Sequence, residues 1–80
     1  MTDNSMPEYE VIDRGTAILI DGFFVGIGSL DLDNAEVKKA ICTIKTWIDD
    51  LKTKGVGPDD CTFTIDVIDN KILPAVEPND

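Results

Sequence analysis

The apolar residues of this chain recur with two periods, one typical of an α-helix and one typical of β-strands. Over residues 34–54 they recur every three or four positions, which predicts one amphipathic helix. Over CTFTIDVI (61–68) they alternate with polar residues, which predicts a half-buried strand. YEVID (9–13) is predicted to be a short strand. KILPAV (71–76) is an optional edge strand, since Pro74 has no amide hydrogen to donate to a ladder.

Both ends of the predicted helix carry capping signals. Asp33 followed three residues later by Glu36 is a variant of the capping box, which predicts Asp33 as the N-cap. At the other end, Gly55 stands where a left-handed C-terminal cap is expected, and Val56 would contact Leu51 as in a Schellman motif. These signals bound the helix independently of its apolar period.

The segment ILIDGFFVGIG (18–28) is apolar on both faces and is interrupted only by Asp21-Gly22. This dipeptide predicts a type I′ hairpin turn, because both of its central residues need a positive φ. The two-residue turn places Ile20 opposite Phe23 and continues that register along both strands. A second turn is expected at Asp69-Asn70 or one residue later.

The register sorts the side chains of the hairpin onto two sheet faces. One face is expected to pack on the helix together with the inward residues of 61–68. That helix-facing set is Ile18, Ile20, Phe23, Val25 and Ile27, with Cys61, Phe63, Ile65 and Val67. The opposite set is Ala17, Leu19, Phe24 and Gly26.

The order of elements predicts an α+β fold, a two-layer sandwich with one amphipathic helix packed on a small antiparallel sheet. The strands and helix follow one another as β-β-β-α-β, with a further strand as the open alternative. We expect a single domain over 9–76, between flexible tails at 1–8 and 77–80.

One helix covers only one face of such a sheet, so the opposite face predicts an interaction site. An exposed apolar patch among polar neighbours usually marks such a site. We expect a second copy of the chain to cover it in a homodimer, with a different protein as the next candidate. The alternative is that a terminal segment of the chain folds over the patch. The predicted contact residues are Ala17, Leu19, Phe24 and Gly26.

The net charge of −9, from 16 acidic and 7 basic residues, opposes direct binding to nucleic acid or to anionic lipid. The acids concentrate outside the predicted helix, at turns and on the outer sheet, where they would suit a basic partner. The alternative is an ordinary solvated surface. The candidate acidic surface consists of Asp13, Asp21, Asp31, Asp59, Asp60, Asp66 and Asp69.

Motifs for catalysis, cofactors and metals are weak in this sequence. Gly26-x-Gly28 lacks the spacing of a dinucleotide or phosphate loop, and DLDNAE (31–36) fails the EF-hand pattern. Histidine, the commonest general base, is absent. Cys42 and Cys61 are expected to be two small buried hydrophobic residues, with a disulfide as the alternative. We therefore expect no catalytic residue, no cofactor and no metal.

These observations favour a non-catalytic, small acidic protein that acts through protein–protein contacts. One form is an inhibitor that mimics nucleic acid, as small phage anti-defence and anti-CRISPR proteins do, because carboxylates can occupy sites built for phosphates. The alternatives are a dimeric small subunit or accessory domain of a larger complex, or a small-molecule-binding dimer. No apolar run is long enough for a membrane span and MTDNSMPEYE is not a signal peptide, so the cytoplasm is expected.

Overall fold

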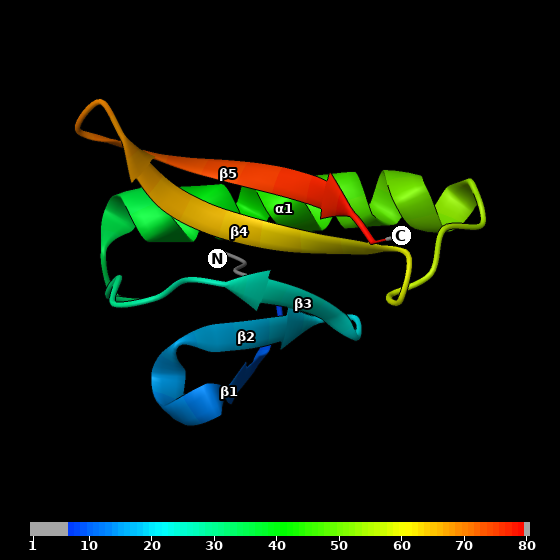
Figure 1. The fold of residues 1–80 in the computed structure, drawn as a ribbon, viewed down its shortest axis with the longest axis horizontal. Helices are drawn as coiled ribbons and strands as arrows, with labels where there is room; N and C mark the ends of the chain where they lie inside the picture. The colour runs from blue at the N-terminus through cyan, green and yellow to red at the C-terminus, as the bar shows by residue number, and fades with distance from the viewer. Residues whose placement is uncertain (1–6, 80) are drawn as a thin grey trace, which may run out of the picture.

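Five strands form one sheet in the order β1-β2-β3-β4-β5, and one helix covers one of its faces (Figure 1). The computed structural model describes residues 7–79. The α+β fold class is confirmed, including the further strand. The elements are β1 Glu10–Ile12, a 3-10 turn η1 Asp13–Gly15, β2 Ala17–Ile20, β3 Phe23–Gly26, α1 Ala35–Thr53, β4 Cys61–Ile68 and β5 Lys71–Pro78.

The sheet is mostly antiparallel, and its one parallel pair joins β3 to β4. Helix α1 forms the connection between these two strands and returns the chain to the end of the sheet from which β3 started. A connection of this length is what parallel neighbours require. The parallel ladder is short and pairs Val25 with Phe63 and Gly26 with Thr64.

Both hairpins turn on two left-handed residues. Asp21 and Gly22 have φ values of 52° and 86°, and Ile20 pairs with Phe23, which confirms the predicted register. The second turn uses the first of its two predicted positions, Asp69–Asn70, where both φ values are again positive. The type I′ class therefore sets both connections.

The N-cap of α1 is Asn34 and not Asp33. The side chain of Asn34 accepts a hydrogen bond of 2.8 Å from the backbone amide of Glu36. The backbone amide of Asp33 instead donates to the carboxylate of Asp31 in a preceding turn, at 2.9 Å. The prediction was wrong by one residue because Asp and Asn are about equally good N-caps and stand side by side here.

The C-terminal end of α1 is the predicted Schellman motif. The amide of Val56 donates to the carbonyl of Leu51 at 3.0 Å, and the amide of Gly55 donates to that of Lys52 at 3.1 Å. Gly55 has a φ of +82°, a value that favours glycine over residues with a Cβ. The motif directs the chain away from the helix and toward the start of β4.

The hydrophobic core lies between α1 and the helix-facing side of the sheet. Phe63 is at its centre, edge-on to Phe23 at 5.9 Å and stacked on Trp47 at 6.4 Å between ring centroids. The predicted helix-facing residues of the hairpin are all buried. Val67 is a correction, because it is 57% exposed where β4 runs past the cover of the helix. The buried cluster is Ile18, Ile20, Phe23, Val25, Ile27, Val37, Ala40, Ile41, Ile44, Ile48, Cys61, Phe63 and Ile65.

The two predicted tails are only partly within the described residues, since 1–6 and 80 lie outside them. Near the N-terminus, Tyr9 packs against the core cluster. Near the C-terminus, β5 continues to Pro78. The side chain of Asn79 then accepts from Thr62 Oγ1 at 2.9 Å and donates to the Asp59 carbonyl at 3.3 Å.

Candidate protein-binding surface

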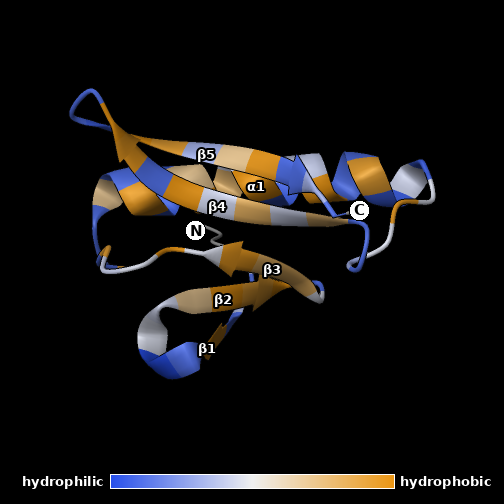
Figure 2. Cartoon of the chain, in the orientation of Figure 1, coloured by the Kyte–Doolittle hydropathy of each residue, from blue (hydrophilic) through white to orange (hydrophobic). Residues whose placement is uncertain are grey.

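The sheet face that points away from α1, called the outer face below, has no cover from the described residues. In Figure 1 the helix lies behind β4 and β5, so the outer face is turned toward the viewer. Figure 2 shows that β2 and β3 are apolar along their length, whereas β4 alternates. Strand alternation places part of this apolar content on the outer face.

Three large apolar side chains of the outer face are substantially exposed. Phe24 on β3 is 36% exposed, Leu73 on β5 is 42% exposed and Ile68 on β4 is 50% exposed. Leu19, which pairs with Phe24, is partly buried. The exposed apolar side chains of the outer face thus come from β3, β4 and β5, and Phe24 and Leu19 are two of the predicted contact residues.

Ala17 is a correction, since it is only 1% exposed and offers no contact surface. It lies in the interior of the sheet, paired with Ile12 on one side and Gly26 on the other. The alternating pattern assigned its face correctly but could not reveal its depth.

Gly26 keeps a partly exposed position beneath the ring of Phe24. A Cβ placed on this glycine would lie 3.5 Å from Cε1 of Phe24 and 3.9 Å from Cγ2 of Thr64. Both distances are ordinary van der Waals contacts, so the ring of Phe24 lies close to this position. Gly26 has no side chain of its own to offer a partner.

Leu73 was missed by the sequence reasoning because KILPAV was treated as an optional strand. Its pairing with Asp66 places both side chains on the outer face. The signal was present in the alternation of Leu73 with Ile72 and Pro74, which face the helix side. Those faces are assigned only when the position of the second hairpin turn is known, because the turn sets the register of β5 on β4.

The outer face carries more acid than base. Glu10 on β1, Asp66 on β4 and Glu77 on β5 lie on this side of the sheet, and Lys71 is the cation there. By contrast, residues 33–54, which include α1, hold five of the seven basic residues of the chain. The same segment also holds four acidic residues, so it is close to neutral, whereas the outer face is acidic.

The seven predicted acidic residues do not form one surface. Of these, Asp66 alone lies on the outer face, and the others are at turns. The turn at Gly22 and the loop at Pro58 lie together, since a Cβ on Gly22 would lie 3.4 Å from Pro58 Cγ. One end of the sheet thus has Asp21, Asp59 and Asp60, and the other end has Asp13, Asp31 and Asp69.

Asp21 joins the β2–β3 turn to the helix. Its carboxylate accepts a short hydrogen bond from Lys45 and lies 3.5 Å from the ammonium of Lys52. The hydrogen bond from Lys45 lowers the pKa of Asp21 and raises the pKa of Lys45. Lys45 also binds Asp49 at 2.9 Å. This arrangement gives Asp21 a structural role within the chain.

The free edge of β5 is poorly suited to the addition of another strand. The amide of Asn79 donates to the carbonyl of Asp60 at 2.9 Å, so alternate residues from Lys71 to Asn79 point their amides at β4. Pro74 and Pro78 have the opposite parity and point outward. A proline ring in that position removes the donor and occupies its space, which protects the edge. The face is therefore the better candidate surface.

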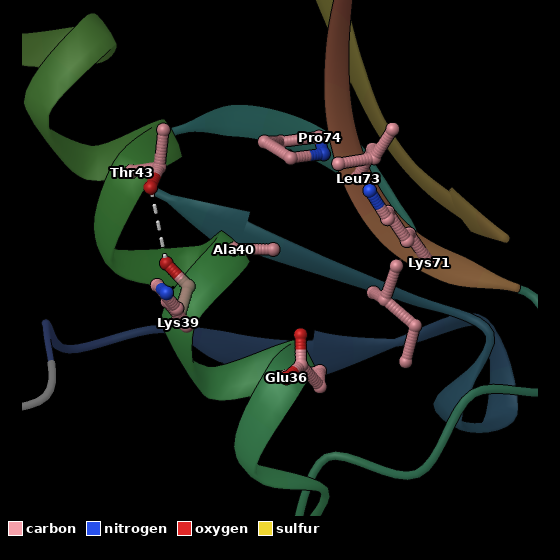
Figure 3. A pocket seen from close by; sticks show the side chains of 8 residues that line it. Glu36, Lys39, Ala40, Thr43, Lys71, Leu73 and Pro74 are labelled. Atoms are coloured by element: carbon pink, nitrogen blue, oxygen red, sulfur yellow. Dashed lines mark hydrogen bonds between the residues drawn. The ribbon is translucent and has the colours of Figure 1, made fainter. Parts of the chain in front are cut away.

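A groove lies between α1 and β5 (Figure 3). Its volume is about 260 Å³, and Ala40 lies opposite Ile72 and Pro74 across it. Lys39 and Lys71 stand near its rim together with Glu36, so no single charge dominates. A second, more apolar hollow of about 440 Å³ lies at the end of α1, lined by Leu51, Val56, Cys61 and Val76 among others.

The two cysteines differ in environment. Cys61 is buried on β4, and burial raises the pKa of its thiol, with a smaller contribution from Asp60. Cys42 is exposed on α1, which corrects the expectation that both are buried. The structure does not join the two residues in a disulfide. A raised pKa makes the Cys61 thiol a poor nucleophile.

Within residues 7–79, no three side chains of His, Cys, Asp or Glu gather as a metal site would require. Among the same residues, no helix combines the length and hydropathy needed to cross a bilayer. Comparisons of the chain with protein-family models, curated proteins and solved structures found no match.

Proposed function

We propose that this chain is a non-catalytic protein-binding module whose outer face docks on a protein partner. The observation that carries the proposal is the exposure of Phe24, Ile68 and Leu73 on one face of the sheet. Covering a large apolar side chain is worth roughly 1.5–3 kcal/mol when burial is complete. Because these side chains are exposed, they contribute little to the stability of the fold. Exposed apolar surface among polar neighbours usually marks an interaction site.

The form of this proposal in which the chain mimics nucleic acid has weaker support. Mimicry needs carboxylates spaced along one surface, and the acidic residues at the turns are divided between two ends of the sheet. The proposal therefore rests on the apolar face, with acidic residues at its border. It keeps the cytoplasm as compartment, where thiols such as that of Cys61 stay reduced.

Site-specific photocrosslinking tests this function. A photoreactive side chain replaces Phe24 on the outer face in one variant and Lys38 on α1 in a second, and both are exposed to lysate of the producing cell. We expect position 24 to give a discrete crosslinked protein that position 38 does not give. The identified protein is then purified and titrated with the unmodified chain.

The reconstituted pair separates specific docking from adventitious capture. Leu73→Ser is expected to weaken the complex at least about tenfold, because it removes one of the exposed apolar contacts of the outer face. Lys38→Ser is the matched control and should bind as the wild type does. Equal crosslinking from both positions, or binding unaffected by Leu73→Ser, would remove the outer face as the docking surface.

A further inference from the structure

One row of the outer face runs across all five strands and has a carboxylate at each end. Glu10 pairs with Leu19, Leu19 pairs with Phe24, and Thr62 pairs with Glu77. The parallel register of β3 and β4, continued by one residue beyond Val25 and Phe63, places Phe24 beside Thr62. The acid row, as we call Glu10, Leu19, Phe24, Thr62 and Glu77, thus has an apolar centre and acidic ends.

Sheet geometry fixes the spacing of the two acidic ends. Neighbouring strands lie about 4.8 Å apart, so four intervals separate the backbones of Glu10 and Glu77 by about 19 Å. Leu19 and Phe24 occupy the interval between them. A surface that complements this row has an apolar centre flanked by two cations at a similar separation.

A second copy of the chain does not meet that requirement. Two outer faces brought together would place three carboxylates and one lysine from each copy in one interface. Like charges in an interface that excludes water are costly.

We infer that the outer face takes a different protein whose apolar docking site is flanked on two sides by Lys or Arg. This inference rests on the proposed function and adds the chemistry of the partner. Ion pairs at Glu10 and Glu77 would set the orientation of the partner, and contact with Phe24 would supply the apolar contribution to the binding free energy. The complex is expected to weaken as salt concentration rises.

Two synthetic helical peptides that differ in the spacing of two lysines test this inference. Each presents leucines on one face with two lysines on the same face, about 14 residues or about 7 residues apart, which is about 21 Å or about 10 Å along a helix. Fluorescence anisotropy measures their binding to the purified full chain. We expect the wide peptide to bind roughly two- to fivefold more tightly, since it forms two exposed ion pairs where the narrow peptide can form one.

Charge variants locate the effect on the acid row. E10Q with E77Q is expected to remove the preference for the wide peptide. D13N with D69N is the matched control, because it changes net charge equally and asparagine tolerates the left-handed backbone at both positions. The control should keep the preference. Deletion of residues 1–6 should also leave the preference unchanged, because the acid row lies wholly within the described residues.

Several results would overturn the inference. Equal binding of the two peptides would contradict it. An equal loss of the preference for the wide peptide in both double variants would show that only the net charge of the chain matters. A dimer seen by light scattering and abolished by Phe24→Asp would assign the face to a second copy. Stronger peptide binding after deletion of residues 1–6 would show that this segment occupies the outer face. The proposed function itself fails separately if neither Phe24→Ser nor Leu73→Ser changes binding of the wide peptide.

Discussion

The two hairpins of this molecule share one turn geometry and differ in what surrounds them. The β2–β3 hairpin lies inside the sheet, between β1 and β4, and most of its side chains are buried. The β4–β5 hairpin lies at the edge of the sheet, and its turn projects from the rest of the ribbon (Figure 1). Val67 and Ile68, just before that turn, are exposed on opposite faces.

The comparison teaches that turn chemistry specifies a hairpin without specifying its burial. Asp21-Gly22 and Asp69-Asn70 both provide the two positive φ values of a type I′ turn. Burial depends on where each hairpin lies relative to α1. The first hairpin therefore contributes chiefly to stability, and the tip of the second contributes hydrocarbon to the surface.

The largest expected effect comes from two adjacent phenylalanines of the first hairpin. Phe23 is 1% exposed and contacts Phe63, so Phe23→Ala should cost about 3–5 kcal/mol and leave the domain largely unfolded. Phe24 faces the other way and is partly exposed, so Phe24→Ala should cost roughly 1–2 kcal/mol. Urea denaturation measures both.

Phe23→Leu is the milder variant that keeps this comparison measurable if the alanine variant does not fold. It should still lose more stability than Phe24→Leu. Equal losses at the two positions would mean that the outer face is as well covered as the core.

The local features of the first hairpin and the helix were predictable from the sequence, because neighbouring residues determine them. The register from Ile20 and Phe23 follows from a two-residue turn, and the Schellman motif follows from Gly55. The apolar stripe of α1 predicts which side of the helix is buried. In each case the physical cause lies within a few residues along the chain.

The remaining features depend on contacts between distant segments. The parallel pairing of Val25 with Phe63 and the depth of Ala17 follow from the order of strands, which no local pattern contains. The same order separates Asp21 from Asp69 at opposite ends of the sheet. The candidate site was therefore half predicted: Phe24 and Leu19 followed from alternation, whereas Leu73 needed the position of β5.

The two turns give the next largest expected effect. Gly22 has a φ of +86°, which a residue with a Cβ adopts only with strain, so Gly22→Ala should cost about 1–2 kcal/mol. Asn70 has a φ of 65° in the projecting turn, where the residue already carries a Cβ. Asn70→Ala should therefore cost less, about 1 kcal/mol or below. Thermal unfolding of both variants checks the order, and the reverse order would contradict it.

A smaller effect is expected at the tip of the second hairpin. Ile68 is half exposed, so Ile68→Thr should lower the free energy of unfolding by less than about 1 kcal/mol. Ile65, three residues earlier on β4, is buried beneath α1, and Ile65→Thr places a hydroxyl in the core, which should cost several times more. Urea midpoints compare the pair. Similar losses would show that the tip is covered in solution.

The smallest expected effect separates the two turns by pH. Lys45 lowers the pKa of Asp21 by hydrogen bonding, so this interaction stabilises the fold above the ordinary pKa of the carboxyl and is lost as pH falls through the lowered value. Asp21→Asn keeps the type I′ turn and removes the charge. Its urea midpoint should be lower than that of the wild type at neutral pH, and the difference should shrink below about pH 4.

Asp69→Asn is the matched control in the second hairpin, because none of the ion pairs among the described residues involves Asp69. Its difference from the wild type should not follow that trend. The Asp21 effect stays small because both partners are about one-third exposed, and exposed ion pairs contribute little. A difference for Asp21→Asn that persists at low pH would mean that the carboxylate acts through the turn geometry and not through Lys45.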